Sequence, residues 1–511
     1  MIVSRKGAKT QRKARQEFLS LLSAFLCVFA PLREKLLNDL SLEPSTGLHD
    51  SYDLRKNLVM KSWSRLAFLF AVASVAVSAQ QVIRITEPTA INPAEVSIAI
   101  NPKNPDNIIA VSFQTGHPPK PRAGSYHYVT FDGGKTWKTV PTPDPKNLVQ
   151  GDDVVVFSVD GVAYHVHLSF DGIRLARPAR AENGMIINVS KDGGNTWSDG
   201  TVAVNHINTV IPFEDKPGLV VDTAPASRSK GNVYLAWTRF DVYGSANPEH
   251  HSQIYFTRST DQGQTFSMPF RISDTGGDCL DSDNTVEGAV PAVGPNGEVY
   301  IVWAGPLGLV FDKSLDGGLT FGKNKVIGDI PGGWDFSIEG LERANGMPNT
   351  AVDLSNGANK GTLYVNWIDA RNGDPDVFVM SSKNGGETWS SPVRVNDDPI
   401  KNGKAQFFTW MAVDPVDGSV NVVFYDRRDT SGTQTRLTLA RSIDGGRSFV
   451  NHKIDMPPFP VNSRVFFGDY SSISAYGGRV VPAFMHFVND NSLAISVALF
   501  RFKPGTQEII K

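Results

Sequence analysis

The sequence contains very little cysteine. Two of its 511 residues are cysteines, Cys27 and Cys279, which excludes a disulfide-rich scaffold and a zinc site built from cysteine ligands. A strong charge of one sign is also absent, because 50 basic residues stand against 52 acidic ones. This balance excludes a surface that coats nucleic acid, so nucleic acid is not an expected partner.

A short apolar run near the N-terminus is too short to span a bilayer, and it has the features of a secretory signal. Residues 60–79 start with Lys61 and Arg65, continue as LAFLFAVASVAV and end on the small residues VSA before Gln80. A basic segment, an apolar segment and a small-residue cleavage site are the three parts of a signal peptide. We therefore expect a secreted or periplasmic protein with no stable membrane insertion after cleavage.

Because a signal peptide opens a chain, we expect translation to start at Met60 and residues 1–59 to be a mis-called upstream extension. The alternative is that SLLSAFLCVFA (20–30) is itself a signal or anchor. Without the twelve basic and six acidic side chains of residues 1–79, the remaining domain, 80–511, has 38 basic and 46 acidic ones and a net charge of −8. Its one cysteine forms no intrachain disulfide, and we expect a monomer.

An eight-residue pattern occurs six times along this domain. Asp or Asn stands at its third position, one or two glycines follow, and Trp or Phe closes it, with spacings of 60, 69, 55, 68 and 60 residues. The copies are TFDGGKTW (130–137), SKDGGNTW (190–197), STDQGQTF (259–266), SLDGGLTF (314–321), SKNGGETW (382–389) and SIDGGRSF (442–449). An Asp side chain accepts backbone N–H groups of its own loop, and glycine adopts conformations that other residues resist. These properties favour a hairpin turn over a calcium or sugar site in each copy.

The flanks of the pattern repeat as well, and they predict four antiparallel strands per unit, A to D, with the pattern at the C–D turn. Seven segments match the A strand, from VSIAIN (96–101) to SSISAY (471–476). The seventh unit has no D strand after its C strand, and VIRIT (82–86) is its expected donor. We predict an all-β chain folded as one seven-bladed β-propeller that is closed by its N-terminal strand. Six blades with an irregular insertion are the alternative.

The six patterns resemble those of the Asp-box (BNR-repeat) proteins, whose best-known members are sialidases. The resemblance covers nearly all of residues 80–511 and implies that the boxes lie on the face opposite an active site. Strand direction implies the same, because C–D and A–B turns share one face whereas D–A and B–C loops share the other. The candidate functional face is therefore the one that carries the D–A and B–C loops.

Acidic residues stand just before several A strands on that face. Because A strands line the channel of a propeller, these carboxylates are expected to ring its mouth and to raise one another's pKa, as a general acid requires. The alternative is that they cap turns and meet solvent. They are Glu95, Asp152, Asp153, Glu214, Asp215, Glu287 and Asp469.

The B–C loops on the same face supply arginines. Arg239, Arg371 and Arg427 follow the B strands of three units, and the resemblance to sialidases implies that three arginines hold the substrate carboxylate. It likewise implies a tyrosine nucleophile paired with a glutamate, and an aspartate as the acid/base. The alternative for the arginines is ion pairing that fixes loops, Asp369 with Arg371 and Asp426 with Arg428.

The candidates for the other implied roles are Tyr425 or Tyr470 as nucleophile, Glu287 as its partner and Asp153 or Asp215 as acid. The sialidase signature Phe-Arg-Ile-Pro is absent, and VIRIT around Arg84 is the nearest stretch. Three functions follow from these observations: an exo-glycosidase that removes terminal sialic-acid-type residues, a non-catalytic propeller that binds glycan or protein, and a hydrolase that uses two carboxylates across the channel. A glycan or glycoconjugate is the expected partner.

Two further loops have functional interpretations. DCLDSDNTVE (278–287) is rich enough in oxygen for calcium, although it lacks the spacing of an EF-hand, and a solvated acidic loop is favoured; no cofactor is expected otherwise. The loop 328–349 is long and has Trp334 and Phe336 at its middle. It either covers a site or buries its own aromatics. Trp237, Trp303 and Trp367 lie within B strands and are expected in the core.

Overall fold

The computed structural model describes residues 80–114, 123–172 and 181–510. The predicted signal peptide (60–79) and upstream extension (1–59) lie outside the described residues. The described part contains no helix long and apolar enough to cross a membrane.

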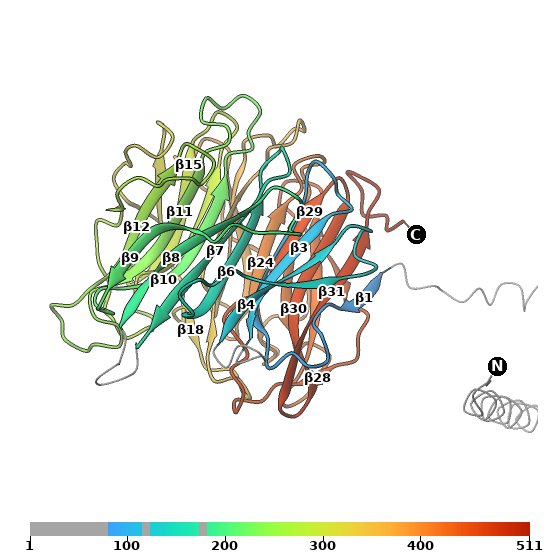
Figure 1. The fold of residues 1–511 in the computed structure, drawn as a ribbon. Coiled ribbons are helices and arrows are strands. Elements are labelled where there is room, and N and C mark those ends of the chain that lie inside the picture. The colour runs from blue at the N-terminus through green and yellow to red at the C-terminus, as the bar shows by residue number, and fades with distance from the viewer. Residues whose placement is uncertain (1–79, 115–122, 173–180, 511) are drawn as a thin grey trace, which may run out of the picture. The chain divides into compact units, whose positions relative to one another are not determined.

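Seven antiparallel sheets follow one another along the chain (Figure 1). Each has four strands in sequence order, A to D, apart from the last, and the prediction of an all-β propeller with seven blades is confirmed. The first four blades are β2 (Ala94–Ile100), β3 (Ile108–Gln114), β4 (Gly124–Thr130) and β5 (Lys138–Pro141); β6 (Val149–Phe157), β7 (Ala163–Asp171), β8 (Glu182–Ser190) and β9 (Thr201–Ile207); β10 (Phe213–Val221), β11 (Val233–Phe240), β12 (Ser252–Ser259) and β13 (Phe270–Arg271); and β14 (Glu287–Val293), β15 (Val299–Gly305), β16 (Gly308–Ser314) and β17 (Lys325–Gly328).

The remaining blades are built in the same way. They are β20 (Asn349–Val352), β21 (Leu363–Asp369), β22 (Asp376–Ser382) and β23 (Val393–Arg394); β24 (Gln406–Val413), β25 (Val420–Asp426), β26 (Gln434–Ser442) and β27 (Val450–Lys453); and β29 (Ser472–Tyr476), β30 (Arg479–Asn489), β31 (Ser492–Arg501) and β1. Two short additions are the hairpin of β18 (Asp335–Phe336) and β19 (Ala344–Asn345), and β28 (Phe459–Pro460), which pairs with β26.

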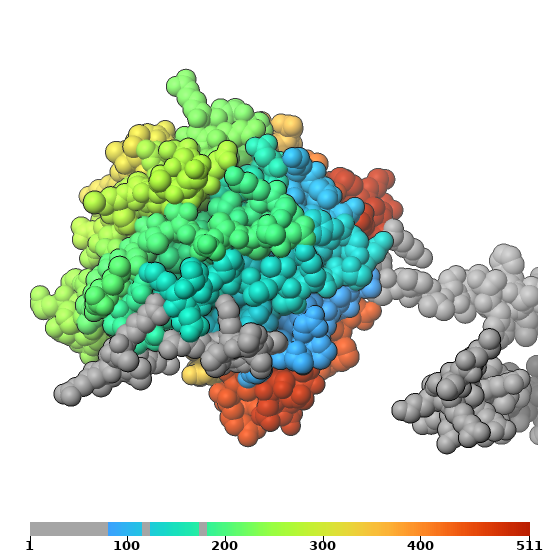
Figure 2. Space-filling model, in the orientation of Figure 1, coloured from blue at the N-terminus to red at the C-terminus, as the bar shows by residue number. Residues whose placement is uncertain are grey.

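The N-terminal strand completes the last blade, as the sequence predicts. β1 (Gln81–Arg84) pairs antiparallel with β31, and Gln81 lies opposite Leu499. The first and last blades therefore lie side by side, as the blue and red segments of Figures 1 and 2 show. This pairing joins the two chain ends and satisfies the edge of β31, which would otherwise offer unpaired backbone groups.

The six boxes form tight turns between strands C and D. In the first box, Asp132 accepts hydrogen bonds from the Thr136 backbone N–H (3.0 Å) and from the hydroxyls of Thr130 (2.8 Å) and Thr136 (2.7 Å). Gly134 has φ +96°, and a Cβ there would lie 2.8 Å from Leu499 of the neighbouring blade. Both the positive φ and this close approach require glycine. The boxes are structural turns on the face opposite the D–A and B–C loops.

The core lies between adjacent blades. Trp237, Trp303 and Trp367, each on a B strand, are at most 1% exposed and pack within three separate clusters of buried apolar side chains. The expectation that they are core residues is confirmed. This packing makes the blades a rigid support for the loops that connect them.

Candidate functional site

A cavity opens where the A strands begin, on the face that carries the D–A loops. It has a volume of about 660 Å³, part of which is open to solvent, and it is lined by residues of six A strands and of the loop that precedes β20. Because every blade contributes to it, the cavity lies on the propeller axis, and we call it the axial cavity. The chemically active side chains along it are Asp152, Asp153, Lys216, Asp469 and Tyr470.

A β-bulge interrupts five of the A strands where they pass this cavity. The first residue of each bulge has a positive φ: Glu95 (57°), Asp152 (53°), Lys216 (48°), Gly288 (75°) and Phe408 (48°). A bulge redirects a side chain that would otherwise follow the strand's alternation, and a positive φ in a residue other than glycine stores strain that is typical of functional sites. Three successive blades thus present a charged residue at the same position.

Two basic side chains, Lys216 and Arg343, lie among the carboxyl groups near the axial cavity. Lys216 Nζ lies 2.5 Å from Asp469 Oδ2 and 4.0 Å from Glu95 Oε1. Arg343 donates from Nε to Asp469 Oδ1 (2.8 Å) and from a terminal nitrogen to Asp281 (2.8 Å). Burial by itself raises the pKa of Asp469, but Lys216 and Arg343 lower this pKa to about 2. Asp469 is therefore ionised.

The pKa values of three other carboxyl groups nearby are shifted in the opposite direction. Burial raises the pKa of Glu95, Asp215 and Glu287 well above their ordinary values. For Asp215 the neighbouring Asp152 adds to the effect, both by its charge and through a hydrogen bond between the two carboxyl groups. Neither carboxyl oxygen of Glu287 has a hydrogen-bond partner within the described part of the chain. Of the predicted carboxyl groups, Asp152, Asp153 and Asp469 line the axial cavity, whereas Glu95, Asp215 and Glu287 lie in the A strands β2, β10 and β14 and are not part of its lining.

Asp153, on β6 of the second blade, and Tyr470, just before β29 of the last blade, both line the cavity. Asp153 is fully buried, and one of its oxygens lies 2.8 Å from His165. The Tyr470 hydroxyl has no hydrogen-bond partner among the described residues, burial raises its pKa, and Lys216 Nζ lies 5.4 Å from its ring. Of the two candidate nucleophiles, Tyr470 is the one that lines the cavity.

Tyr425 lies elsewhere. Its side chain is fully buried, its hydroxyl donates to the Met485 carbonyl (2.8 Å), and its ring stacks on Phe407 with 5.3 Å between centroids. Burial raises its pKa well above the ordinary value. These contacts place Tyr425 in the core between the last two blades.

The three predicted arginines do not line the axial cavity. The Arg239 Nε donates to Glu214 (2.8 Å), and its guanidinium lies 3.7 Å from the centroid of the Tyr255 ring. Arg371 donates from Nε to both oxygens of Asp369 (2.9 Å each). Each guanidinium is thus held by a carboxylate of its own blade.

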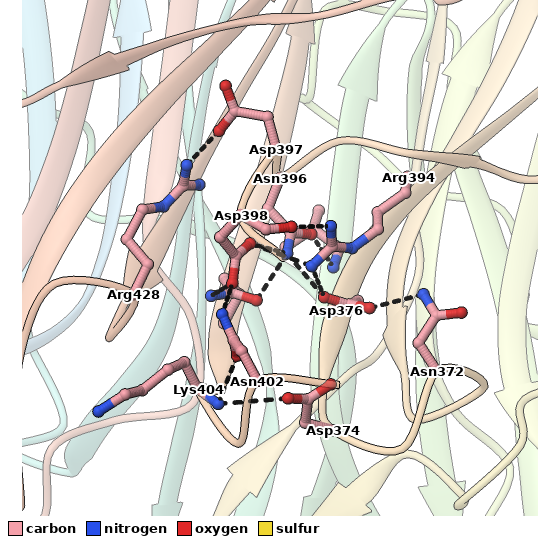
Figure 3. A network of polar contacts seen from close by, with 12 residues as sticks. Asn372, Asp374, Asp376, Arg394, Asn396, Asp397, Asp398, Asn402, Lys404 and Arg428 are labelled. Carbon is pink, nitrogen blue, oxygen red and sulfur yellow. Dashed lines mark hydrogen bonds and ion pairs between the residues drawn. The ribbon is translucent and has the colours of Figure 1, made fainter. Parts of the chain in front are cut away.

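Arg427 is held differently, because its guanidinium donates to the Glu339 carbonyl (2.7 Å) and to the Thr435 hydroxyl (3.1 Å). Arg428, next in the chain, belongs to a polar network between two blades (Figure 3). It donates to Asp426 (2.6 Å) and also contacts Asp397, while Arg394 bridges Asp376 (2.7 Å) and Asp398 (3.0 Å). The contacts of Arg371 with Asp369 and of Arg428 with Asp426 match the alternative to a substrate clamp, namely ion pairs that fix loops.

The acidic loop 278–287 is folded around its own carboxylates. Asp283 accepts the backbone N–H groups of Trp334 (2.8 Å) and Asp335 (2.7 Å), and Asp281 accepts from the Tyr243 hydroxyl (2.8 Å) as well as from Arg343. Within residues 80–114, 123–172 and 181–510, no group of three or more His, Cys, Asp or Glu side chains is placed to hold a metal ion.

The long loop after the fourth blade buries its own aromatic side chains and also contributes to the cavity lining. Trp334 and Phe336 are buried, at 3% and 8% exposure, and the same loop brings Asn345 and Met347 to the axial cavity. It also carries Arg343, which the sequence reasoning missed because no pattern marks a single arginine in an irregular loop. Lys216 was missed too, although it directly follows the acidic pair Glu214 and Asp215.

Comparison with known proteins matches one of the repeats. Residues 128–139 match the family model "BNR/Asp-box repeat", and no curated protein matches the chain. The match covers the first box, so the chain carries an Asp-box repeat on a seven-bladed β-propeller.

Solved structures of similar fold share little sequence with it. A protein of unknown function from Dyadobacter fermentans is 12% identical (TM-score 0.45; 83% of this chain and 99% of that one are covered). An ulvan lyase of polysaccharide lyase family PL25 is 14% identical (TM-score 0.45; 81% and 95%). The NanB sialidase from Streptococcus pneumoniae is 10% identical (TM-score 0.44; 82% and 94%).

Proposed function

We propose that this protein is a secreted or periplasmic carbohydrate-directed hydrolase that cleaves a terminal, sialic-acid-type residue from a glycoconjugate in the axial cavity. One observation carries the proposal: Asp152, Asp153 and Asp469 line one cavity together with Tyr470, and the pKa of Asp469 is lowered by Lys216 and Arg343 whereas that of Asp215, next to Asp152, is raised by burial. Glycoside hydrolysis needs one group that gives a proton to the leaving oxygen and another that stabilises or attacks the anomeric carbon.

The surrounding residues suit these roles. Asp215 adjoins Asp152, which lines the cavity, and the charge of Asp152 adds to burial in raising the pKa of Asp215, as a proton donor to the leaving oxygen requires. Tyr470 supplies a buried hydroxyl without a partner in the described chain. Lys216 and Arg343 provide positive charge for a substrate carboxylate, which the arginines of the B–C loops are not placed to do from the axial cavity.

The second candidate function is a propeller that binds glycan or protein without cleaving it. Lys216 and Arg343 are both already paired with Asp469, and much of the remaining lining is apolar, including Val96, Ala289 and Trp410. A sugar ring could stack in such a cavity without meeting an available acid and nucleophile.

The test is hydrolysis of a fluorogenic N-acetylneuraminic acid glycoside, with and without calcium, beside neutral aryl glycosides. Asp215→Asn removes the proposed acid while its shape is kept, and we expect kcat to fall about 100-fold or more. Asp199→Asn, which changes an acidic residue in the connection between strands β8 and β9, outside the cavity lining, is the matched control and is expected to keep full activity.

Arg371→Ala locates the anion-binding groups. Activity that survives this change supports Lys216 and Arg343 as the contacts for the substrate carboxylate, whereas loss of activity would return that role to the B–C loops. No release of fluorophore by folded, monodisperse wild-type protein on any substrate would contradict the hydrolase and favour the binding propeller, which a glycan array would then test.

A further inference from the structure

A line of three buried side chains leads away from the axial cavity. Asp153 on β6 lines the cavity, and its Oδ1 lies 2.8 Å from Nε2 of His165 on β7. The other ring nitrogen of His165, Nδ1, lies 2.9 Å from Nε2 of His127 on β4. All three residues have no exposed surface. The line therefore connects the cavity wall of the second blade to the third strand of the first blade.

The surroundings of the line keep His127 neutral and in place. Burial lowers the pKa of His127 well below its ordinary value, and the neighbouring His165 lowers it further. The Trp197 ring, which closes the second box, stacks on His127 with 3.9 Å between centroids and 9° between planes. Burying two imidazole rings and a carboxylate is costly unless their hydrogen bonds are satisfied, and the contacts along the line satisfy both nitrogens of His165, Nε2 of His127 and Oδ1 of Asp153.

If both imidazoles are neutral and Asp153 is ionised, these hydrogen bonds have one direction. An ionised Asp153 only accepts, so His165 must carry its proton on Nε2 and donate it to Oδ1. His165 Nδ1 is then an acceptor, and His127 must donate to it from Nε2. The Thr142 hydroxyl, 3.4 Å from His127 Nδ1, lies at the far end of the line. The result is one carboxylate oxygen that is held firmly, whereas the other, Oδ2, has no partner in the described chain.

We propose that Asp153 is the proton-accepting carboxylate of the axial cavity and that His165 and His127 are positioning residues that hold it in this role. The proposal rests on the hydrolase function proposed above. Asp153 Oδ2 takes a proton from a water molecule as the water oxygen bonds to the anomeric carbon. The bond from that carbon to the leaving oxygen breaks, and the leaving oxygen takes the proton of Asp215. Before the next turnover Asp153 releases its proton to solvent and Asp215 takes one up from solvent.

Other titratable groups face the line from each packed element. The ring of His167, two residues further along β7, lies 5.3 Å from that of His165, and its Nε2 contacts Asn188 (3.1 Å) instead of the carboxylate. Tyr128 on β4 and Tyr470 before β29 are both buried, and the charge of Asp153 adds to burial in raising the pKa of each. His167 is thus a matched control: it is buried, adjacent and outside the line.

The first experiment does not depend on activity. Nitrogen-15 NMR of the full-length protein with labelled histidine resolves the tautomer of each of the ten histidines, with assignments from single His→Gln variants. We expect the Nε2–H form for both His165 and His127 at neutral pH, and a mixture at both positions in Asp153→Asn. An Nδ1–H form at His165 in the wild type, or no change in Asp153→Asn, would overturn the positioning role even if the protein is an active hydrolase.

The second experiment measures kcat and KM between pH 4 and 9. His165→Phe removes the donor to Asp153, and we expect kcat to fall at least tenfold with KM nearly unchanged. His165→Gln retains an N–H near the Nε2 position and is expected to recover most of that loss, with an altered pH profile. Equal effects of His165→Phe and His167→Phe, or no rescue by His165→Gln, would refute the inference. Complete inactivity of the wild type would instead refute the proposed function and leave the tautomers to decide the positioning role.

Discussion

The two faces of the propeller use aspartate in opposite ways. On the box face, Asp261 is satisfied by its own turn, with bonds from the Ser259 hydroxyl (2.7 Å), the Thr265 N–H (2.9 Å) and the Thr265 hydroxyl (2.6 Å). The two hydrogen bonds from Thr265 are the main reason that the pKa of Asp261 falls to about 2. On the cavity face, burial instead raises the pKa of Asp215 and Glu287, and both Glu287 oxygens lack partners in the described structure.

The difference separates the part of the propeller that repeats in each blade from the part that is formed by several blades together. A turn whose acceptors are filled by neighbours four residues away can be copied in every blade without further conditions. A buried carboxyl group depends on charges from several blades, such as Lys216 from the third and Asp469 at the start of the seventh. The box face is therefore modular, and the cavity face is a single site that no one blade contains. The following predictions test this contrast.

Lys216→Met is expected to have the largest effect on stability. The lysine is nearly buried between Asp469 and Glu95, and removing one partner of a buried ion pair leaves an uncompensated charge, which costs about 3–5 kcal/mol. Chemical denaturation at pH 7 measures the loss. Lys135→Met, an exposed lysine within the first box, is the control and should change the free energy of unfolding by less than about 0.5 kcal/mol. Equal losses would remove the distinction between the two faces.

Glu287→Gln is expected to change the pH dependence of stability. Because the pKa of Glu287 is higher in the folded than in the unfolded state, its stabilising contribution is full below about pH 4.3 and is lost as the pH rises through the folded-state pKa. The glutamine variant lacks this loss. We expect it to match the wild type at pH 4 and to be more stable at pH 8, as thermal unfolding across that range will show. A variant that is less stable at pH 8 would mean that the carboxylate has a partner.

Most of the fold could be predicted from the sequence because its cause is local. Each box has its complete hydrogen-bonding set within eight residues, and the missing D strand of the last blade is visible as one unit short of a strand. VIRIT carries the same pattern as the other D strands, and it pairs where that pattern predicts, Val82 opposite Ala498. Blade number and closure therefore need only the count of repeating units.

The site could be predicted only in part, because its contacts join residues that lie far apart in the sequence. Of the seven acidic residues predicted at the A strands, Asp152, Asp153 and Asp469 line the cavity, since strand direction brings them to one end of the channel. The bulges at Glu95, Asp152 and Lys216 cannot be read from alternation, and Arg343 reaches the ring from a loop without a repeat. The arginines of the B–C loops follow a repeating pattern, and like the boxes they have partners within their own blades, apart from Arg427, which bonds to a neighbouring loop.

Asp261→Ala tests the modular face. It removes the acceptor of the hydrogen bonds that close one box, much as loss of a helix cap removes an acceptor, and it should cost about 1–2 kcal/mol. Because the loss is confined to one turn, activity in the axial cavity should be unchanged when it is measured well below the unfolding temperature. Reduced kcat in the folded variant would show that the box is coupled to the cavity.

Asp261→Asn is expected to have the smallest effect, because the fifth box already uses asparagine. Asn384 Oδ1 accepts from the Ser382 hydroxyl (2.9 Å) and the Thr388 N–H (3.0 Å), and its Nδ2 donates to the Thr388 hydroxyl (2.9 Å), which thereby changes from donor to acceptor. We expect a loss below about 1 kcal/mol at pH 7.

Stability at acidic pH distinguishes aspartate from asparagine at position 261. The low folded-state pKa of Asp261 contributes stability above about pH 3.9 that is lost as the pH falls toward 2, so the gap between the wild type and Asp261→Asn should close over that interval. The reciprocal variant Asn384→Asp should gain the same acid dependence, which denaturation at pH 2 to 5 will measure. A gap that stays constant with pH would mean that the charge of the box aspartate contributes nothing and that its shape alone closes the turn.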